Sequence, residues 1–460
     1  MKVVRFVFTF ICLCFMLQGN ALAGNTLSDV LKEKGMITKE DWIRIQAAEE
    51  KKAEETQKKL AEESPVKAGW GKKGFTLETR DGLWKTAIQW RFQGRYSFSR
   101  RSDPLTAKNF NDKSKESTFE LRRVRMKVGG HGYKPWIKYY FEMDWQPTRK
   151  SGESPSASTA RLIDWRIDLS KFKWLQLRVG QWKINYNRER VDSSGRQQFV
   201  ERSIVNSTFT IDRQVGAMLY GHVAPGTLFD SRYYAGVFTG SGRGETNDDR
   251  NMMYMGRYQW NFLGRDLKWQ QSDIAYHQQP AGSMAFSAYT TRGKCTRWSS
   301  SGCGTLAFPN SAGVAFTKDS AASNGQFRVS GFMEEVAFKW RGFSFQHEYH
   351  WKEIKDKNLN SGAAGYKTNL MGSYAQVGYF PHGLISAIPK PLEIAFRFAF
   401  VDPNQSAKHD KLKAYTTAIN WFFAGHRNKL TLDGTWFALQ QPTGKDLNQQ
   451  QVRLQWDVSF

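Results

Sequence analysis

Long apolar runs are missing from this sequence beyond its first 24 residues. No later stretch approaches the ~20 apolar residues that a membrane-spanning helix needs, so the sequence predicts no spanning helix. Only 40% of the 460 residues are hydrophobic, yet 14% are aromatic. Many aromatic residues on a polar chain are typical of a β-barrel with a wet interior and aromatic girdles at the membrane interfaces.

Cysteine is scarce. The chain has four, and we expect Cys12 and Cys14 to leave with a cleaved N-terminal segment. Residues 1–23 have the parts of a secretory signal peptide, which are basic Lys2 and Arg5, an apolar core from Phe6 to Leu17, and the small-residue motif Ala21-Leu22-Ala23 before Gly24. An uncleaved membrane anchor is the weaker alternative, because the apolar core is too short to span a bilayer.

The two remaining cysteines, Cys295 and Cys303, lie eight residues apart in a stretch rich in Gly and Ser. A secreted chain folds in an oxidising compartment, where neighbouring cysteines form disulfides. We therefore expect a local disulfide between them and not a metal or redox site.

Acidic residues are outnumbered, with 43 Asp and Glu against 67 Lys and Arg, which gives a formal charge of +24. Loss of Lys2 and Arg5 with the signal peptide leaves +22. An excess of this size indicates an anionic partner, such as a nucleic acid, a lipid headgroup or a small anion. Secretion makes nucleic acid the least favoured of these, and we expect no nucleic-acid partner and no cofactor.

Residues 24–68 differ in composition from the rest of the chain. Thr38-Lys39-Glu40-Asp41 is typical of a helix start, and the following residues to Glu63 are rich in Ala, Glu and Lys. Only Trp42, Ile45 and Leu60 form an apolar stripe, which is too thin for a firm coiled-coil assignment. We interpret this segment as a solvated periplasmic helical leader; a weak oligomerising coil is the alternative.

From residue 69 onward the chain reads as a succession of strands in which apolar and polar residues alternate. The last ten residues, QVRLQWDVSF, put Val452, Leu454, Trp456, Val458 and Phe460 on one face and only polar residues on the other. This ending resembles the closing strand of bacterial outer-membrane β-barrels. A charge on a lipid face costs about 2–4 kcal/mol at the bilayer centre, and the apolar faces of these segments carry none.

Sixteen strands are predicted, which makes the chain an all-β antiparallel transmembrane barrel over 69–460. Their ranges are 84–101, 118–130, 135–146, 161–170, 173–183, 213–223, 230–240, 251–262, 266–278, 327–340, 342–354, 369–380, 391–402, 411–423, 428–440 and 449–460. Short links alternate with long polar ones, as in outer-membrane barrels, and the even strand number places both termini in the periplasm. The long links are 102–117, 147–160, 184–212, 279–326 and 355–368.

Sixteen strands enclose an aqueous channel, and we expect the long link 184–212 to fold into it as a constriction. Rings of Arg and Lys select anions, and guanidinium groups match phosphate oxygens with two hydrogen bonds. Any one of these residues can instead pair with a carboxylate, as Arg166 can with Asp164 or Asp168. The predicted anion pathway comprises Arg91, Arg95, Arg101, Arg123, Arg125, Lys127, Arg166, Arg178, Arg188, Arg190, Arg196 and Arg202.

Several segments resemble the phosphate-selective porin O/P family. The most specific is LRVGQWKINYNRERVDSSGRQQFVERS at 177–203, a Val-Gly-Gln strand followed by a Glu-Arg-Ser loop. ELRRVRMKVGG at 120–130 is similar to the family's Arg-Arg-x-Arg strand. The other similar segments are 31–42, 137–145, 212–221, 233–242, 378–383 and 418–436.

The resemblance implies a homotrimeric outer-membrane channel that passes phosphate or polyphosphate through an arginine-lined lumen. It carries over best to Arg123, Arg125, Arg188, Arg190 and Arg202. The long link 279–326 matches no segment of the family. The partners expected on this basis are small phosphate-like anions, outer-membrane lipid and two further copies of the chain.

Other functions remain open at this point. A general diffusion porin with a weak anion bias, or a channel for another oxyanion, would share these features. An outer-membrane hydrolase would need Ser and His together at one interface, but the eight histidines are scattered. A purely structural barrel would lack the basic excess inside. GETNDD at 244–249 resembles a loose calcium loop, as many polar loops do.

Overall fold

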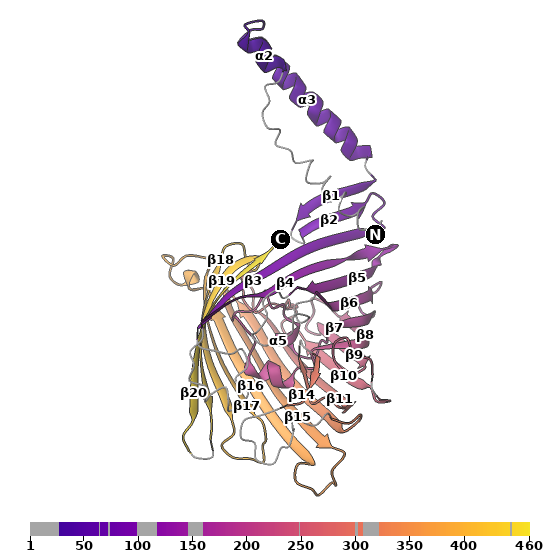
Figure 1. Cartoon of the computed structure of the whole chain (residues 1–460), viewed down its shortest axis with the longest axis vertical. Coiled ribbons are helices and arrows are strands. Elements are labelled where there is room, and N and C mark those ends of the chain that lie inside the picture. Colours follow the sequence, from indigo (N-terminus) through magenta and orange to yellow (C-terminus); the bar gives the residue numbers. More distant parts are fainter. Residues whose placement is uncertain are drawn as a thin grey trace. The chain divides into compact units, whose positions relative to one another are not determined.

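The computed structural model describes residues 27–63, 65–71, 74–98, 117–145, 160–247, 249–299, 302–306, 322–441 and 444–460. The predicted signal peptide and Arg101 lie outside the described residues. Two compact units make up the chain, Met1–Lys67 and Ala68–Phe460 (Figure 1).

The first unit is a pair of helices, α2 (Leu27–Glu33) and α3 (Lys39–Glu63). Thr38 begins α3: its Oγ1 accepts a hydrogen bond from Asp41 N at 3.1 Å and donates one to Asp41 Oδ2 at 2.6 Å. These contacts with Thr38 lower the pKa of Asp41. Trp42 joins the helices, donating to Asp29 Oδ1 at 2.8 Å. Among the described helices, none is long and apolar enough to cross a membrane.

The second unit is a closed antiparallel barrel of sixteen strands, which confirms the predicted fold (Figure 1). Each strand pairs with the next, and β20 pairs with β3 from Val452↔Phe98 to Ser459↔Arg91, which closes the ring. The strands are β3 (Lys85–Phe98), β4 (Ser117–Gly132), β5 (Lys134–Asp144), β6 (Arg161–Leu169), β7 (Gln176–Lys183), β8 (Arg213–Val223), β9 (Ser231–Phe238), β10 (Met253–Trp260), β11 (Ala281–Gly293), β14 (Phe327–Trp340), β15 (Phe343–Asp356), β16 (Lys367–Tyr379), β17 (Leu392–Asp402), β18 (Leu412–Phe422), β19 (Asn428–Leu439) and β20 (Leu447–Ser459).

One predicted strand is wrong. Residues 266–278 form no strand but part of a long connection from β10 to β11, and the ninth strand of the ring, β11, lies inside the predicted loop 279–326. Leu267 and Trp269 alternate with polar residues as in a lipid-facing strand, but Leu267 is 2% exposed and packs against Ala281 and Ala337. The small residues of β11 gave a weaker alternation. The three-residue link implied between the predicted strands 251–262 and 266–278 is therefore part of a longer connection, from Trp260 to Ala281.

A hairpin of β1 (Val66–Gly71) and β2 (Gly74–Thr79) extends the sheet beyond the ring. β2 pairs with β3 from Phe75↔Ile88 to Glu78↔Lys85, along the part of that edge that β20 does not reach. Gly74 has φ +82°, and a Cβ there would lie 2.2 Å from the Ile88 carbonyl oxygen. Only glycine fits where the hairpin meets the end of β20.

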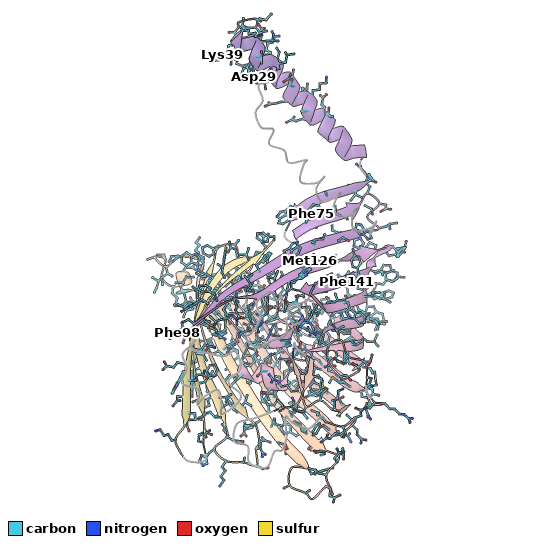
Figure 2. All side chains as sticks on the ribbon, in the orientation of Figure 1. Asp29, Lys39, Phe75, Phe98, Met126 and Phe141 are labelled. Atoms are coloured by element: carbon cyan, nitrogen blue, oxygen red, sulfur yellow. A yellow bond between two sulfur atoms is a disulfide. The ribbon has the colours of Figure 1, made fainter. Side chains whose placement is uncertain are left out.

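The two faces of the barrel differ in polarity as predicted. Along β20, Val452 and Trp456 are 47% and 55% exposed on the outer face, whereas Arg453 and Asp457 are buried on the inner face. Phe141 of β5 is likewise exposed, and Figure 2 shows that side chains also fill the interior of the ring. Lipid therefore meets an apolar wall, and the ionic residues lie in the lumen.

Leu432→Arg tests the lipid-facing assignment. Leu432 is exposed on β19 and pairs with Leu454 of β20, so an arginine there enters the hydrocarbon region. We expect the free energy of unfolding in phospholipid vesicles, measured by urea titration, to fall by about 2–4 kcal/mol. Thr435→Arg, on the inner face of the same strand, is the matched control. An equal or smaller loss for Leu432→Arg would contradict the assignment.

Candidate functional site

The segment 184–212, which includes α5 (Arg188–Val191) and α6 (Ile204–Phe209), lies inside the barrel. Figure 1 shows α5 within the ring of strands. The segment bonds to inward side chains on opposite walls: Glu201 to Arg95 of β3, and Arg188 to Glu335 of β14. Because the segment forms ion pairs with two opposite walls of the lumen, it crosses the interior of the channel.

Glu201 anchors the segment to the β3–β4 wall. Its carboxylate lies 2.7 Å from Arg95, 3.2 Å from Arg122 and 3.2 Å from Arg123. Burial disfavours the charged carboxylate, but Arg123, Arg95 and Arg122 outweigh burial and hold the pKa of Glu201 well below its ordinary value. The carboxylate is therefore ionised throughout the neutral range, and it partly neutralises three arginines.

On the opposite wall the charges are reversed, because carboxylates of β14 and β15 hold the start of α5. Glu335 accepts from the backbone N of Arg188 at 3.0 Å and from its Nε at 2.9 Å. Arg257 of β10 shares the same carboxylate at 2.9 Å. Glu348 accepts from the backbone N of Glu189 at 2.7 Å. These carboxylates satisfy the first free N–H groups of the helix.

A third wall, formed by β16 to β19, binds residues 197–200. Gln198 Nε2 donates to Glu393 Oε1 at 2.8 Å, and Val200 N donates to Asp433 Oδ2 at 3.0 Å. Asp433 also binds Arg453 of β20 at 2.7 Å. The segment is thus tied to three separate parts of the lumen wall.

The connection 261–280 also enters the lumen and meets segment 184–212. Gln271 joins the two: it accepts from Gln198 N at 2.7 Å and donates to Gln197 Oε1 at 2.9 Å. Trp269 places its ring 4.8 Å from the guanidinium of Arg188. Sequence reasoning missed this element, because its apolar residues were assigned to a strand. The polar run Gln270 to Asp273 beside them was the available signal.

A small hairpin, β12 (Arg297–Ser299) and β13 (Gly302–Gly304), packs on α6. A disulfide joins Cys295 to Cys303, with a Cα–Cα distance of 5.5 Å. Arg297 Nε donates to Ser207 O at 2.8 Å. Trp298, only 1% exposed, donates to Gly240 O at 2.7 Å. This part of the loop that resembled no family segment supports α6.

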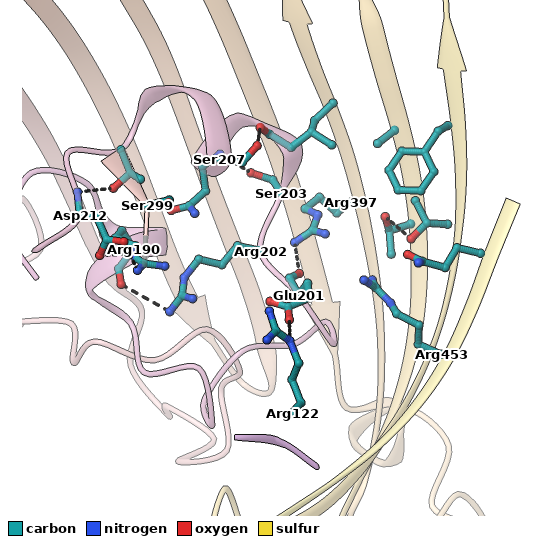
Figure 3. A pocket seen from close by; sticks show the side chains of 18 of the residues that line it. Arg122, Arg190, Glu201, Arg202, Ser203, Ser207, Asp212, Ser299, Arg397 and Arg453 are labelled. Atoms are coloured by element: carbon teal, nitrogen blue, oxygen red, sulfur yellow. Dashed lines mark hydrogen bonds and ion pairs between the residues drawn. The ribbon is translucent and has the colours of Figure 1, made fainter. Parts of the chain in front are cut away.

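A cavity of about 310 Å³ lies against residues 190–212 and the inner wall (Figure 3). Seven arginines line it, against two carboxylates, Glu201 and Asp212. Arg190 binds Asp212, and Arg397 lies 3.4 Å from Glu189. Arg202 donates instead to backbone carbonyls, those of Glu189 at 2.7 Å and Asp192 at 2.6 Å. The seven arginines are Arg122, Arg123, Arg190, Arg202, Arg297, Arg397 and Arg453.

A second cavity, of about 410 Å³, touches the same segment at Asn185, Val191 and Ser193. Six basic side chains line it, against the two carboxylates of Glu142 and Asp164. Both carboxylates are engaged, Glu142 with Arg125 at 3.0 Å and Asp164 with Arg213. Within the described part of the chain, Lys127 and Lys183 have no ion-pair partner. The basic residues are Arg125, Lys127, Arg166, Arg178, Lys183 and Arg232.

The predicted pathway residues fall into distinct groups. Arg123, Arg190 and Arg202 line the first cavity, and Arg125, Lys127, Arg166 and Arg178 line the second. Two others hold segment 184–212 from β3. Arg91 donates to the hydroxyls of Ser193 and Ser194 at 2.8 Å, and Arg95 binds Glu201.

Two further predicted residues line neither cavity. Arg188 is buried against Glu335, whereas Arg196 is exposed.

Some residues that do line a cavity are also paired with carboxylates. In the second cavity, Arg166 lies 3.2 Å from Asp168, which also binds Arg178. Part of the predicted pathway therefore serves to hold the lumen together.

Strict alternation concealed two basic residues. Arg122 has the lipid-facing parity of β4, but the register with β3 passes from Gln93↔Arg123 to Gly94↔Leu121, so Arg122 is the extra residue of a β-bulge. It therefore reaches the lumen beside Arg123. Lys183 ends β7 where the chain turns inward. The alternation of apolar and polar residues along a strand indicates neither a bulge nor a place where the chain turns into the lumen.

The described residues contain no group of three or more His, Cys, Asp or Glu side chains placed to bind a metal. No curated protein sequence matches the chain. The fold resembles that of the anion-selective porin from Comamonas acidovorans, with a TM-score of 0.50, 8% identity, and coverage of 82% of this chain and 99% of that chain. It equally resembles trimeric OmpT, an outer membrane protein of Vibrio cholerae, with a TM-score of 0.50, 7% identity, and coverage of 82% and 100%.

At such low identities these similarities concern the fold. The sequence profile of phosphate-selective porin O and P matches residues 95–433, most of the barrel and the whole of segment 184–212. The chain therefore belongs to the phosphate-selective porin O and P family and is a porin of the bacterial outer membrane.

Proposed function

We propose that the lumen conducts small anions and prefers phosphate-like ones, with segment 184–212 as the constriction. The observation that carries this proposal is the charge of the two cavities beside the segment. Seven and six basic side chains line them, against two carboxylates in each. A lumen of this sign attracts anions and repels cations.

The arginines favour phosphate over chloride for a geometric reason. A guanidinium offers two parallel N–H donors that match two oxygens of one phosphate, whereas a spherical chloride cannot use both equally. Conduction also requires that each site release the ion. Shared carboxylates such as Glu201 weaken the arginines enough for release. Lys127 and Lys183 supply attraction that no described carboxylate cancels at ion-pair distance.

The same proposal extends to assembly and orientation. We infer a homotrimer, because OmpT from Vibrio cholerae, which shares the fold, has a trimer form. We place both termini in the periplasm, with 1–23 as a cleaved signal peptide and 24–68 as a periplasmic leader. The family and the fold are those of a channel, and we propose no catalytic activity.

Phosphate should block chloride current through the purified trimer. In a planar bilayer with potassium chloride, we expect reversal potentials that show anion selectivity. Added phosphate should lower the chloride current at concentrations well below that of chloride, because it occupies the arginine-lined cavities. A chloride current that does not change when phosphate is added would support a general diffusion porin with a weak anion bias. Sulfate and pyrophosphate, tested alongside, distinguish a channel for another oxyanion.

The double variant Lys127→Gln/Lys183→Gln should weaken that block. Each lysine attracts phosphate by up to about 1 kcal/mol in a hydrated site. Removing both charges should therefore raise the phosphate concentration that halves the chloride current about tenfold. Lys355→Gln/Lys367→Gln is the matched control, since both lysines bind the outward-facing Glu353 at 2.9 Å. Equal block in both double variants would place the anion site elsewhere.

Glu201→Gln should release the constriction from its wall. The amide cannot compensate Arg95, Arg122 and Arg123, so we expect the free energy of unfolding to fall on the order of 2 kcal/mol. Single-channel traces should become noisier and more anion-selective. The control is Glu353→Gln, which removes an outward-facing carboxylate whose two cationic partners, Lys355 and Lys367, lie outside the lumen. Quiet traces of ordinary selectivity in Glu201→Gln would contradict the anchoring role.

A further inference from the structure

Four basic side chains form a row across β11, β14, β15 and β16, which are neighbours in the barrel wall (Figure 1). In the strand register each is directly opposite the next, in the pairs Arg292↔Arg328, Arg328↔Lys355 and Lys355↔Lys367. Neighbouring strands lie about 4.8 Å apart, so the row extends about 14 Å across the sheet. Like charges directly opposite one another destabilise a sheet. This row, which we call the basic row, is therefore costly unless an anion neutralises it.

The basic row belongs to the outer face of the barrel. Arg328 shares a face with Phe332, which is exposed on the outside, whereas Val329 lies on the inner face and is fully buried. On β11, Arg292 shares a face with the exposed Phe286, and the rings of Phe286 and Phe332 stack with centroids 6.4 Å apart. Arg292 and Arg328 are themselves exposed. The barrel wall therefore separates the row from the two cavities of the lumen.

The basic row lies at the rim opposite the C-terminus. There β14 and β16 begin and β11 and β15 end, because successive strands of the ring run in opposite directions. Four residues along β14 separate Arg328 from Phe332, a distance of about 13 Å. Between them on the outer face, the hydroxyls of Ser330 and Thr290 share a hydrogen bond of 3.1 Å. The row thus lies beyond the apolar belt, at the level where lipid headgroups begin.

The protein neutralises only part of this row. Glu353, on the same face as Lys355, binds Nζ of Lys355 and Nζ of Lys367, each at 2.9 Å. Arg292 Nε donates to a backbone carbonyl at 2.8 Å, which fixes the guanidinium without cancelling its charge. Within the part of the chain that the structure describes, the Arg328 side chain has no hydrogen bond and no ion pair. Positive charge therefore remains on the outer surface at both arginines.

One further carboxylate approaches the basic row without pairing with it. Asp249 Oδ2 and Arg292 Nε each lie within 3.5 Å of the position that a Cβ on Gly325 would occupy. No ion pair joins the two side chains among the described ion pairs. Even with Asp249 counted beside Glu353, the row has four cations against two carboxylates.

We propose that the basic row binds the headgroup phosphates of an anionic glycolipid in the outer leaflet of the membrane. The assignment rests on the orientation proposed above, in which the rim opposite the termini faces the cell exterior, and not on the proposed ion selectivity. Basic side chains close to an anionic membrane surface each add to the attraction. An arginine also matches two oxygens of one phosphate. The acyl chains of the same lipid would contact Phe286 and Phe332, so one molecule meets both the apolar belt and the row.

The test uses the full-length protein in detergent micelles, titrated with diphosphoryl lipid A. Native mass spectrometry counts the lipid that each chain retains. We expect the unaltered protein to retain lipid A and to unfold at a higher temperature in its presence. Arg292→Gln/Arg328→Gln should weaken binding at least tenfold, because it removes the two cations that no described carboxylate pairs with. Circular dichroism shows that the variant has folded.

The matched control is Lys134→Gln/Lys171→Gln, which removes two exposed lysines from the other rim. A micelle has no leaflets, so this control separates the basic row from a general attraction between cations and lipid. It should retain lipid A as the unaltered protein does. Asn360→Cys tests the orientation separately. This exposed residue lies in the connection from β15 to β16, and a membrane-impermeant maleimide should label the variant on intact cells.

Several results would overturn the proposal. They are an unaltered protein that retains no lipid A, equal retention by Arg292→Gln/Arg328→Gln, and an equal loss in the control. Equal retention of dephosphorylated lipid A would show that the acyl chains alone bind. Release of lipid A by millimolar inorganic phosphate would show that the row is a site for free phosphate. An unlabelled Asn360→Cys would place the row in the periplasm, whereas phosphate block of the chloride current tests the channel independently of all these results.

Discussion

The ion pairs between segment 184–212 and the barrel wall are the constraint on which the lumen depends. Glu201 meets arginines of β3 and β4, whereas Arg188 meets a glutamate of β14. The segment thus carries opposite charges at the two places where the walls carry their complements. These pairs hold the segment across the channel between the two walls, and the two cavities lie beside it.

The same side chains have two tasks that compete. An arginine that is fully paired holds the segment but attracts no anion, and an unpaired one attracts an anion but holds nothing. In the proposed anion pathway these tasks fall to different residues. Arg188 and Arg95 are engaged by carboxylates, and Arg202 is held by carbonyl oxygens, whereas Lys127 and Lys183 have no ion pair with any residue that the structure describes. Holding a cation by neutral acceptors fixes its position without cancelling its charge.

The amino-acid pattern predicted the barrel, because a strand with lipid on one side and water on the other alternates apolar and polar residues. Nearly every strand of the ring shows this alternation. The pattern failed at 266–278, where Leu267 and Trp269 alternate like a lipid-facing stripe but pack inside the lumen. It could not place Arg122, since a bulge shifts the period by one. Nor could it say which arginines are paired, because partners such as Glu201 and Arg95 are far apart in the sequence.

The β1–β2 hairpin has a bearing on how the ring closes. Antiparallel strands can slide by two residues and keep their faces, so inner and outer polarity alone leave several closing registers open. Here β2 already occupies residues 85–88 of β3, and Phe460 exchanges backbone hydrogen bonds with Trp90 at 3.0 and 3.1 Å. The hairpin acts as a mechanical stop against which β20 seats. The stagger at which the ring closes is therefore limited by a part of the chain that lies outside the ring.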